Sequence, residues 1–238
     1  MRDEQILRLE EMDSRHWWTR SRLALITSHV DKLDIGMKRI FEIGAGSGGT
    51  LDELKHKGYS VIALEPTLYG ANNCTQNGIE TMNISIEDLK VLPSNTGCLL
   101  LLDVLEHLDD DKKILKKLFD ASMQNTFLII TVPADMKLWS QLDLDVYHHR
   151  RYEKNEINQL LIETGWTVQN QRYWMSLLKP VAKLRRKRMN ADFYSETKLP
   201  NQLINFVLFT LVSIEKMIPI IGRIPGTSIL TVAKKLDV

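Results

Sequence analysis

The sequence has only two cysteines, a net charge near zero and no long apolar run, and each absence excludes a class of protein. Cys74 and Cys98 are too few for a disulfide framework and lack the spacing of a zinc site. We therefore expect an intracellular, cytoplasmic protein without a bound metal. A formal net charge of +1 gives no electrostatic reason to expect a nucleic-acid partner. No apolar signal segment follows Met1.

Apolar runs that alternate with helical segments indicate an α/β protein. The predicted strands lie at residues 39–43, 60–65, 81–84, 98–102, 127–132, 166–168 and 227–233. A predicted helix at 14–31 precedes the first strand, and the predicted helices between the strands lie at 50–57, 69–77, 112–119 and 156–164. This alternation favours a doubly wound, mostly parallel, seven-stranded sheet.

A glycine turn follows the first predicted strand. Gly44, Gly46 and Gly48 let the backbone turn tightly and approach a ligand where a Cβ atom would clash. Glu65 ends the second predicted strand, 21 positions after Gly44. A carboxylate at that place can accept hydrogen bonds from both ribose hydroxyls of an adenosine. The pattern therefore predicts a nucleoside site.

An acidic residue inside this turn helps to separate two adenosine ligands. The glycine spacing also fits a dinucleotide, as in an NAD(P)-dependent oxidoreductase. Glu42 would repel a pyrophosphate but suits a cation, and S-adenosylmethionine (SAM) carries a sulfonium and an ammonium. Glu42-Ile-Gly44-Ala45-Gly46-Ser-Gly48 resembles the first motif of the class I SAM-dependent methyltransferases. A plain strand-to-helix turn, with Glu42 paired to a basic residue, stays open as an alternative.

The fourth predicted strand leads into a second motif that resembles this family. Asp103-Val104-Leu-Glu106-His107 is similar to a sequence of many small-molecule methyltransferases, and it lies at the sheet edge where open α/β sheets bind ligands. His107 is a candidate general base, because a free imidazole accepts a proton near neutral pH. In the alternative interpretation, Glu106 and His107 cap the next helix and orient the loop.

A third motif follows the fifth predicted strand. Val132-Pro-Ala, Leu138-Trp-Ser and His148-His149-Arg150-Arg151-Tyr152 resemble a bacterial subgroup of class I methyltransferases. We expect the acceptor pocket between His107 and the 139–152 loop, with Asp143, His148 and His149 as further catalytic candidates. A solvated polar loop is the alternative.

The resemblance to the family implies a Rossmann-like methyltransferase fold and a role for each motif. Glu42 and the glycine turn would hold the methionine end of SAM, Glu65 the ribose and residues 85–87 the adenine. A lid that includes Trp17 would cover the cofactor. The cofactor-binding candidates are Trp18, Arg22, Glu42, Gly44, Ala45, Gly46, Gly48, Glu65, Ser85, Ile86, Asp103 and Val104. Methyl transfer would be a direct in-line displacement.

The resemblance also suggests how the chain is divided. Residues 1–35 would form an N-terminal helical lid, and residues 36–178 with 226–238 the SAM-binding domain. Residues 179–225 would be a helical insertion before the last strand. Its basic run at 183–188 is expected to be exposed, whereas 203–214 reads as an amphipathic helix too short to span a bilayer.

Three functions remain open at this point. The first is a SAM-dependent methyltransferase for a small-molecule or lipid-linked acceptor. The second is an NAD(P)-dependent oxidoreductase, and the third is a non-catalytic, cofactor-binding partner subunit. The apolar face of the 203–214 helix would pack on the domain, form a homodimer, or make peripheral contact with the inner membrane face.

Overall fold

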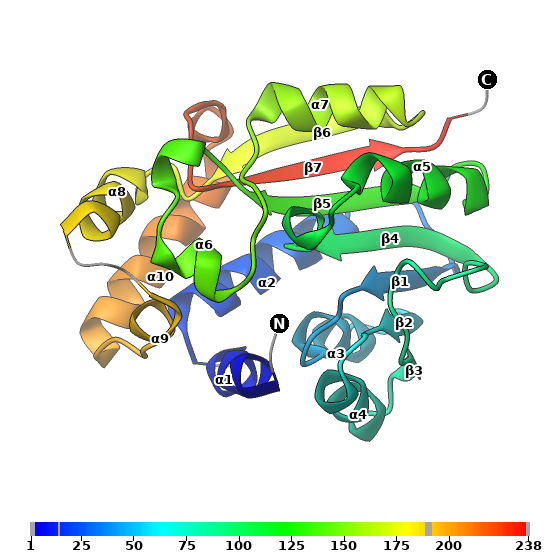
Figure 1. Ribbon diagram of the computed structural model, residues 1–238, viewed down its shortest axis with the longest axis horizontal. Helices are drawn as coiled ribbons and strands as arrows, with labels where there is room; N and C mark the ends of the chain where they lie inside the picture. The colour runs from blue at the N-terminus through cyan, green and yellow to red at the C-terminus, as the bar shows by residue number, and fades with distance from the viewer. Residues whose placement is uncertain (1–2, 14, 189–191, 237–238) are drawn as a thin grey trace.

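The computed structural model describes residues 3–13, 15–188 and 192–236, which form one sheet with helices on both faces (Figure 1). The strands are β1 Arg39–Ile43, β2 Val61–Leu64, β3 Glu80–Met82, β4 Thr96–Leu102, β5 Phe127–Pro133, β6 Thr167–Trp174 and β7 Ser228–Lys234. The helices are α1 Asp3–Asp13, α2 Trp17–Val30, α3 Gly49–His56, α4 Leu68–Gln76, α5 Asp111–Ala121, α6 Gln141–Asp145, α7 Lys154–Glu163, α8 Lys179–Arg188, α9 Phe193–Glu196 and α10 Gln202–Met217. Short 3-10 helices are η1 Leu105–His107, η2 Met136–Leu138 and η3 Ile221–Arg223.

The strand order is β3-β2-β1-β4-β5-β7-β6, which confirms the doubly wound, mostly parallel sheet. Only β7 runs against its neighbours, β5 and β6. The chain leaves β1 toward β2 on one side, whereas β4 pairs with β1 on the other. Ligands bind at such a switch point, outside the carboxyl ends of the strands. The order therefore predicts a site above β1 and β4.

The two faces of the sheet are covered by different helices, and both are apolar. Along β4, Leu99 and Leu101 pack with residues of α5 and α7, whereas Cys98 and Leu100 pack with residues of α2 and α3. This alternation is the two-residue period of a strand buried on both faces. In Figure 1, α5 and α7 lie in front of the sheet and α2 lies behind it.

The N-terminal region contains two helices where the sequence predicted one. The helix expected at 14–31 begins only at Trp17, because His16 is its N-cap and accepts a hydrogen bond from the Trp18 N–H at 3.2 Å. Ser14 lies outside the described residues. Strand β6 begins at Thr167, within the start predicted at 166–168, and extends to Trp174 because it pairs with β7 along its length.

The described residues of the 179–225 segment include α8, α9, α10 and η3, and they pack on the rest of the chain. Asn205 of α10 accepts a hydrogen bond from the Trp17 N–H at 2.9 Å. The expectation that the whole basic run is exposed is corrected for α8, because Arg186 turns inward and donates to the Leu138 carbonyl at 2.6 Å. Within the described ranges, no helix is long and apolar enough to cross a bilayer. The domain bounds stay a prediction.

Candidate active site

The glycine turn joins β1 to α3 and has the conformation that its sequence predicts. Gly44, Gly46 and Gly48 have φ values of 74°, 58° and 83°. A Cβ atom on Gly44 would lie 2.8 Å from Val104 Cγ2, and one on Gly48 would lie 2.8 Å from Cys74 Sγ. Both positions therefore require glycine for their backbone angles and for space.

A cavity of about 400 Å³ lies above the carboxyl ends of β1 and β4. This volume falls in the range of small-molecule sites, roughly 300–1,000 Å³. Its lining includes seven predicted cofactor-binding residues: Trp18, Arg22, Glu42, Gly44, Ala45, Gly46 and Asp103. Residues of α1, α2, α8 and α9 also line it, so the N-terminal helices and the inserted helices both border the site.

Two carboxylates lie at the end of the cavity beside the glycine turn. Glu42 is buried, with 2% of its surface exposed. Asp103 has a φ of 59° and lies 2.9 Å from Nε of Arg22. Arg22 also donates to the Leu102 carbonyl at 3.0 Å, and its guanidinium lies 5.5 Å from the Trp18 ring centre. Arg22 therefore ties α2 to the end of β4.

Five predicted cofactor residues are not part of the cavity lining: Gly48, Glu65, Ser85, Ile86 and Val104. Glu65 is buried and accepts hydrogen bonds from the Gly46 N–H at 2.8 Å and the Thr67 N–H at 2.9 Å. It therefore braces the glycine turn, and a ribose contact would use its remaining lone pairs. Ser85 donates to Asp88 at 3.0 Å, and Ile86 packs in the core. Their contacts with ribose and adenine stay predictions.

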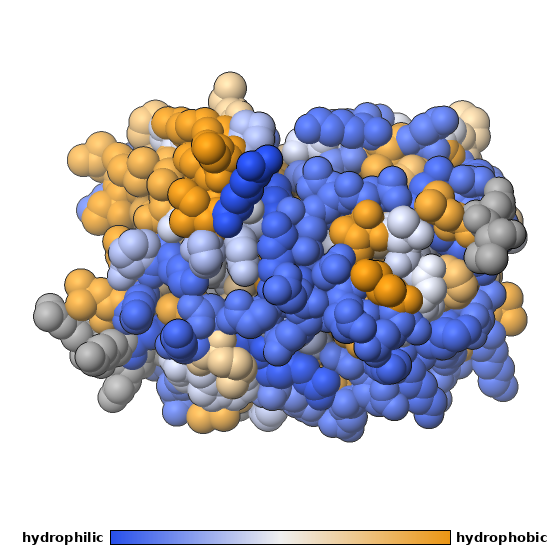
Figure 2. Space-filling model, turned by 90° about the horizontal axis from the view of Figure 1, so that it is seen from above, coloured by the Kyte–Doolittle hydropathy of each residue, from blue (hydrophilic) through white to orange (hydrophobic). Residues whose placement is uncertain are grey.

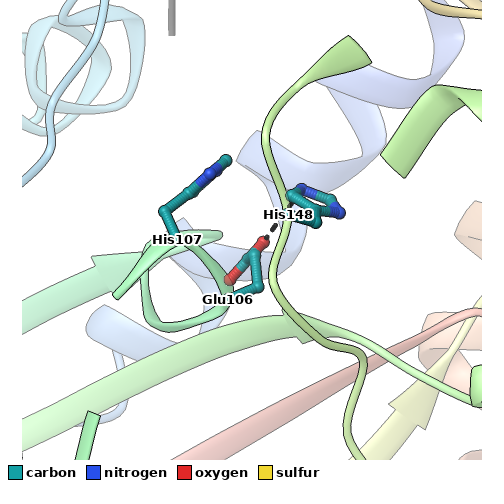
Figure 3. Close-up of side chains that lie close together, drawn as sticks. All are labelled: Glu106, His107 and His148. Carbon is teal, nitrogen blue, oxygen red and sulfur yellow. Dashed lines mark ion pairs between the residues drawn. The ribbon is translucent and has the colours of Figure 1, made fainter. Parts of the chain in front are cut away.

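Glu106, His107 and His148 also line the cavity, and they come from η1 and from the loop after α6 (Figure 3). Asp143 contacts this group through His148, and its side chain is fully buried. Its carboxylate contacts His148 Nδ1 at 2.9 Å and Arg151 Nη2 at 2.7 Å. Burial opposes ionisation of Asp143, but these two partners outweigh it and hold its pKa below the usual value.

Burial and neighbouring groups shift the pKa values of His107 and Glu106, which both belong to η1. Burial, with a smaller contribution from His148, lowers the pKa of His107 to about 4, so its ring is neutral at pH 7 and is a weaker base than free histidine. Burial and the nearby Asp103 raise the pKa of Glu106 well above its usual value. Glu106 is fully buried, and its Oε1 lies 3.7 Å from Nε2 of His148.

His149 does not join this group, and its catalytic role stays a prediction. Its ring lies 3.1 Å from Asp109 and is 41% exposed, and it does not line the cavity. Adjacent residues on an extended loop point in opposite directions, so only one of the two histidines could face the site. The helix-cap part of the alternative interpretation is wrong, because Asp110 caps α5 by accepting from the Lys113 N–H at 2.9 Å. The Glu106 carbonyl instead accepts from the His149 N–H at 2.8 Å, so η1 does contact the loop.

Sequence reasoning missed three arginines in the lining of the cavity, Arg151, Arg185 and Arg186. Arg151 pairs with Asp143, and Arg186 of α8 has its pKa lowered to about 10, chiefly by burial. The Arg150-Arg151-Tyr152 motif contained a signal for the first of them. Nothing local predicted that α8 turns Arg186 inward, because that contact depends on the packing of α8 against the loop after β5.

The comparisons with known proteins decide the family. Residues 16–171 match the family model described as a methyltransferase domain. The chain belongs to this family. Its fold is similar to that of a SAM-dependent methyltransferase from Archaeoglobus fulgidus, at 14% identity, with 95% of this chain and 99% of that chain covered and a TM-score of 0.61. It is also similar to a SAM-dependent methyltransferase from Thermotoga maritima, at 14% identity, with coverages of 98% and 97% and a TM-score of 0.63. No curated protein matches the sequence.

The protein is thus a class I SAM-dependent methyltransferase, and SAM is its cofactor. The cavity fits this ligand, since it combines a glycine turn without side chains and the buried carboxylate of Glu42. SAM supplies an electrophilic methyl group on a sulfonium. The oxidoreductase interpretation of the glycine spacing is therefore wrong.

Proposed function

We propose that this methyltransferase acts on a small-molecule or lipid-linked acceptor by direct in-line displacement. The observation that carries the proposal is a single cavity that joins the glycine turn to His107 and His148. A donor held at one end and an acceptor at the other would meet inside one enclosed volume. Alignment of the reacting atoms about 3–3.5 Å apart provides much of the rate enhancement in such reactions.

The chain's own residues divide between the two ends. Glu42 and the Gly44–Gly46 backbone are placed to hold the cationic methionine part of SAM. His107 and His148 are placed to bind the acceptor and to take up a proton from a hydroxyl or amine, with Asp143 orienting His148. The enclosing helices α2 and α8 would exclude water from the reaction.

Apolar side chains at the α8 and α10 side of the cavity favour an acceptor with an apolar part. Leu178, Val181 and Leu208 line this side. Leu208 belongs to α10, whose outer face and following loop expose large apolar residues, namely Leu203, Phe206, Met217 and Ile220, each with at least 65% of its surface exposed. Figure 2 shows a broad apolar area on the side of the molecule where α10 and the loop to β7 lie.

The apolar side of the cavity thus continues into the exposed apolar face of α10, which supports a lipid-linked acceptor. It also supports peripheral contact of α10 with the inner face of a membrane, since an apolar helix face beside basic residues suits an anionic surface. A homodimer through α10 is the competing use of the same surface. The motifs around Trp139 and Tyr152 support membership of the bacterial subgroup that they resemble. A cytoplasmic location and the absence of a nucleic-acid partner belong to the same proposal.

The direct test is to incubate the purified protein with extracts of its native host and methyl-labelled SAM, and to separate aqueous from lipid products. Label in a small or lipid-soluble product supports the proposal. Label only in RNA or protein would contradict it, and no transfer to any product would favour a non-catalytic subunit.

The surface of α10 has its own test. Cosedimentation with anionic vesicles at low salt should be reduced by Phe206→Ser, whereas Leu7→Ser, at an exposed apolar site on α1, should leave it unchanged. A stable dimer in solution without vesicle binding would favour the homodimer.

A further inference from the structure

Glu106, His107 and His148 have the arrangement of a three-residue metal site. Each offers one ligand atom, and the three atoms lie within 4.8 Å of one another. All three residues line the cavity. Figure 3 shows how their side chains lie near one another. Ligands of one divalent ion, at about 2.0–2.2 Å from it, lie roughly 3–4 Å apart, so small side-chain rotations would close the site.

In both histidines, Nε2 is the ring nitrogen that is available to bind a metal. The Nδ1 atom of His148 lies 2.9 Å from the Asp143 carboxylate, and that of His107 lies 3.3 Å from the Tyr147 carbonyl. Each of these acceptors favours the tautomer with hydrogen on Nδ1 and leaves the lone pair on Nε2. Metal-binding histidines almost always donate their second nitrogen in this way, to a carboxylate or a backbone carbonyl.

The burial of the Glu106 carboxylate is a second, independent observation that supports a metal site. Its side chain is fully buried, and no side chain in the described part of the chain donates a hydrogen bond to either of its oxygens. Its distance of 3.7 Å from His148 Nε2 is too long for a hydrogen bond. A buried carboxylate without hydrogen bonds is costly, and such groups are normally paired or bound to a cation.

We propose that Glu106, His107 and His148 bind one divalent transition-metal ion, with Asp143 as the positioning residue for His148. Two imidazoles and one carboxylate suit Zn²⁺, Mn²⁺, Fe²⁺ or Co²⁺ better than Mg²⁺ or Ca²⁺, which prefer oxygen ligands. Three protein ligands leave at least one position open toward the cavity, as in catalytic rather than structural metal sites. The sequence predicted no metal, because the ligands come from separate motifs.

The open position indicates what the ion does, and this step rests on the proposed function. With the ion bound, the two histidines would act as its ligands instead of as proton acceptors. The metal would lower the pKa of a bound acceptor hydroxyl, which would release its proton to solvent. Its oxygen then forms a bond to the methyl carbon of SAM, and the electrons of the broken carbon–sulfur bond stay on sulfur. The products are a methyl ether and S-adenosylhomocysteine (SAH). The assignment favours oxygen as the methylated atom.

Titration with Co²⁺ tests the site without reference to activity. Protein without a histidine tag is stripped with a chelator, dialysed and titrated, while visible absorption reports nitrogen and oxygen ligands around the ion. One Co²⁺ per chain is expected, displaced by Zn²⁺. Glu106→Gln and His148→Ala should each lower the affinity at least tenfold, and Asp143→Asn by roughly 10–100-fold. The controls His149→Ala and exposed His56→Ala should bind as wild type.

Two results would overturn the proposal: wild-type protein that binds no Co²⁺ or Zn²⁺, or equal affinity in wild type and the isosteric Glu106→Gln. Thermal unfolding of each variant separates loss of the site from loss of the fold. SAH calorimetry on the same samples distinguishes the two proposals. Metal binding without SAH binding would contradict the proposed function alone. SAH binding without metal binding would contradict the metal site alone.

Discussion

Replacing Gly44 and Gly46 separately by alanine should show which glycine the fold needs and which the ligand needs. Both residues have positive φ, at 74° and 58°. The left-handed region costs a residue with a Cβ atom about 1–2 kcal/mol. The two sites differ in their surroundings, because the new Cβ would lie 2.8 Å from Val104 Cγ2 at Gly44 but would meet nothing within 4 Å at Gly46.

Overpacking against Val104 adds about 1–3 kcal/mol to the cost at Gly44. We therefore expect Gly44→Ala to lower the free energy of unfolding by about 2–5 kcal/mol and Gly46→Ala by about 1–2 kcal/mol. Gly46→Ala should instead weaken SAH binding by roughly tenfold or more, since its methyl group would occupy space at the cavity wall.

Urea unfolding of both variants, of Val104→Ala and of the Gly44→Ala/Val104→Ala double variant provides the measurement. Removing the Val104 methyl groups should relieve the overpacking and return about 1–3 kcal/mol of the loss at Gly44, which appears as a coupling energy in the cycle. Equal destabilisation by the two glycine variants, or additive effects of Gly44→Ala and Val104→Ala, would refute the steric argument.

Three further predictions follow from the site and its surroundings. Glu65→Gln should weaken SAH binding by about 1–3 kcal/mol in calorimetry, because a charged acceptor beside the glycine turn is lost, and unchanged affinity would mean that Glu65 does not contact the ribose. His107→Ala and His148→Ala should lower turnover by roughly 10²–10⁴-fold with SAH affinity unchanged, and His149→Ala should be near wild type; equal turnover in all three variants would remove the two histidines from the mechanism. His16 is buried, and burial lowers its pKa from 6.5 to about 4, so the folded protein should lose about 1–3 kcal/mol of stability as the pH falls from 6.5 toward 4. His16→Asn, which keeps an N-cap side chain, should flatten that part of the stability profile, and an unchanged slope would show that another group causes it.

The sequence predicts the sheet and the glycine turn well because both depend on local patterns. The apolar run in β4 alternates between the two faces of the sheet, and this arrangement requires only that helices cover both sides. The turn between β1 and α3 requires positive φ at Gly44, which few other residues tolerate. Such constraints act within a few residues and are therefore readable from the sequence.

The acceptor end of the site is less predictable because it depends on contacts between distant segments. The choice between His148 and His149 is made by Asp143, which orients His148, and by the way the loop crosses η1. Glu106 becomes fully buried only once that loop covers it. No periodicity in the sequence reports such packing.

The packing of the inserted helices was also not predictable from local sequence patterns. The composition of the 183–188 run predicts a solvated basic helix, yet Arg186 is drawn inward by the Leu138 carbonyl. An arginine with an apolar stem can satisfy either environment, so its neighbours in the fold decide which one it adopts.

Calorimetry of SAH binding to the wild-type protein and to Glu42→Gln tests the central claim most directly. Wild type should bind one SAH per chain and show no heat with NAD, and Glu42→Gln should bind SAH more weakly, because the ammonium group of its homocysteine end loses a carboxylate partner. Thermal unfolding of the variant confirms that its fold is intact. NAD binding without SAH binding, or equal SAH affinity in wild type and Glu42→Gln, would contradict the assignment of this cavity to SAM.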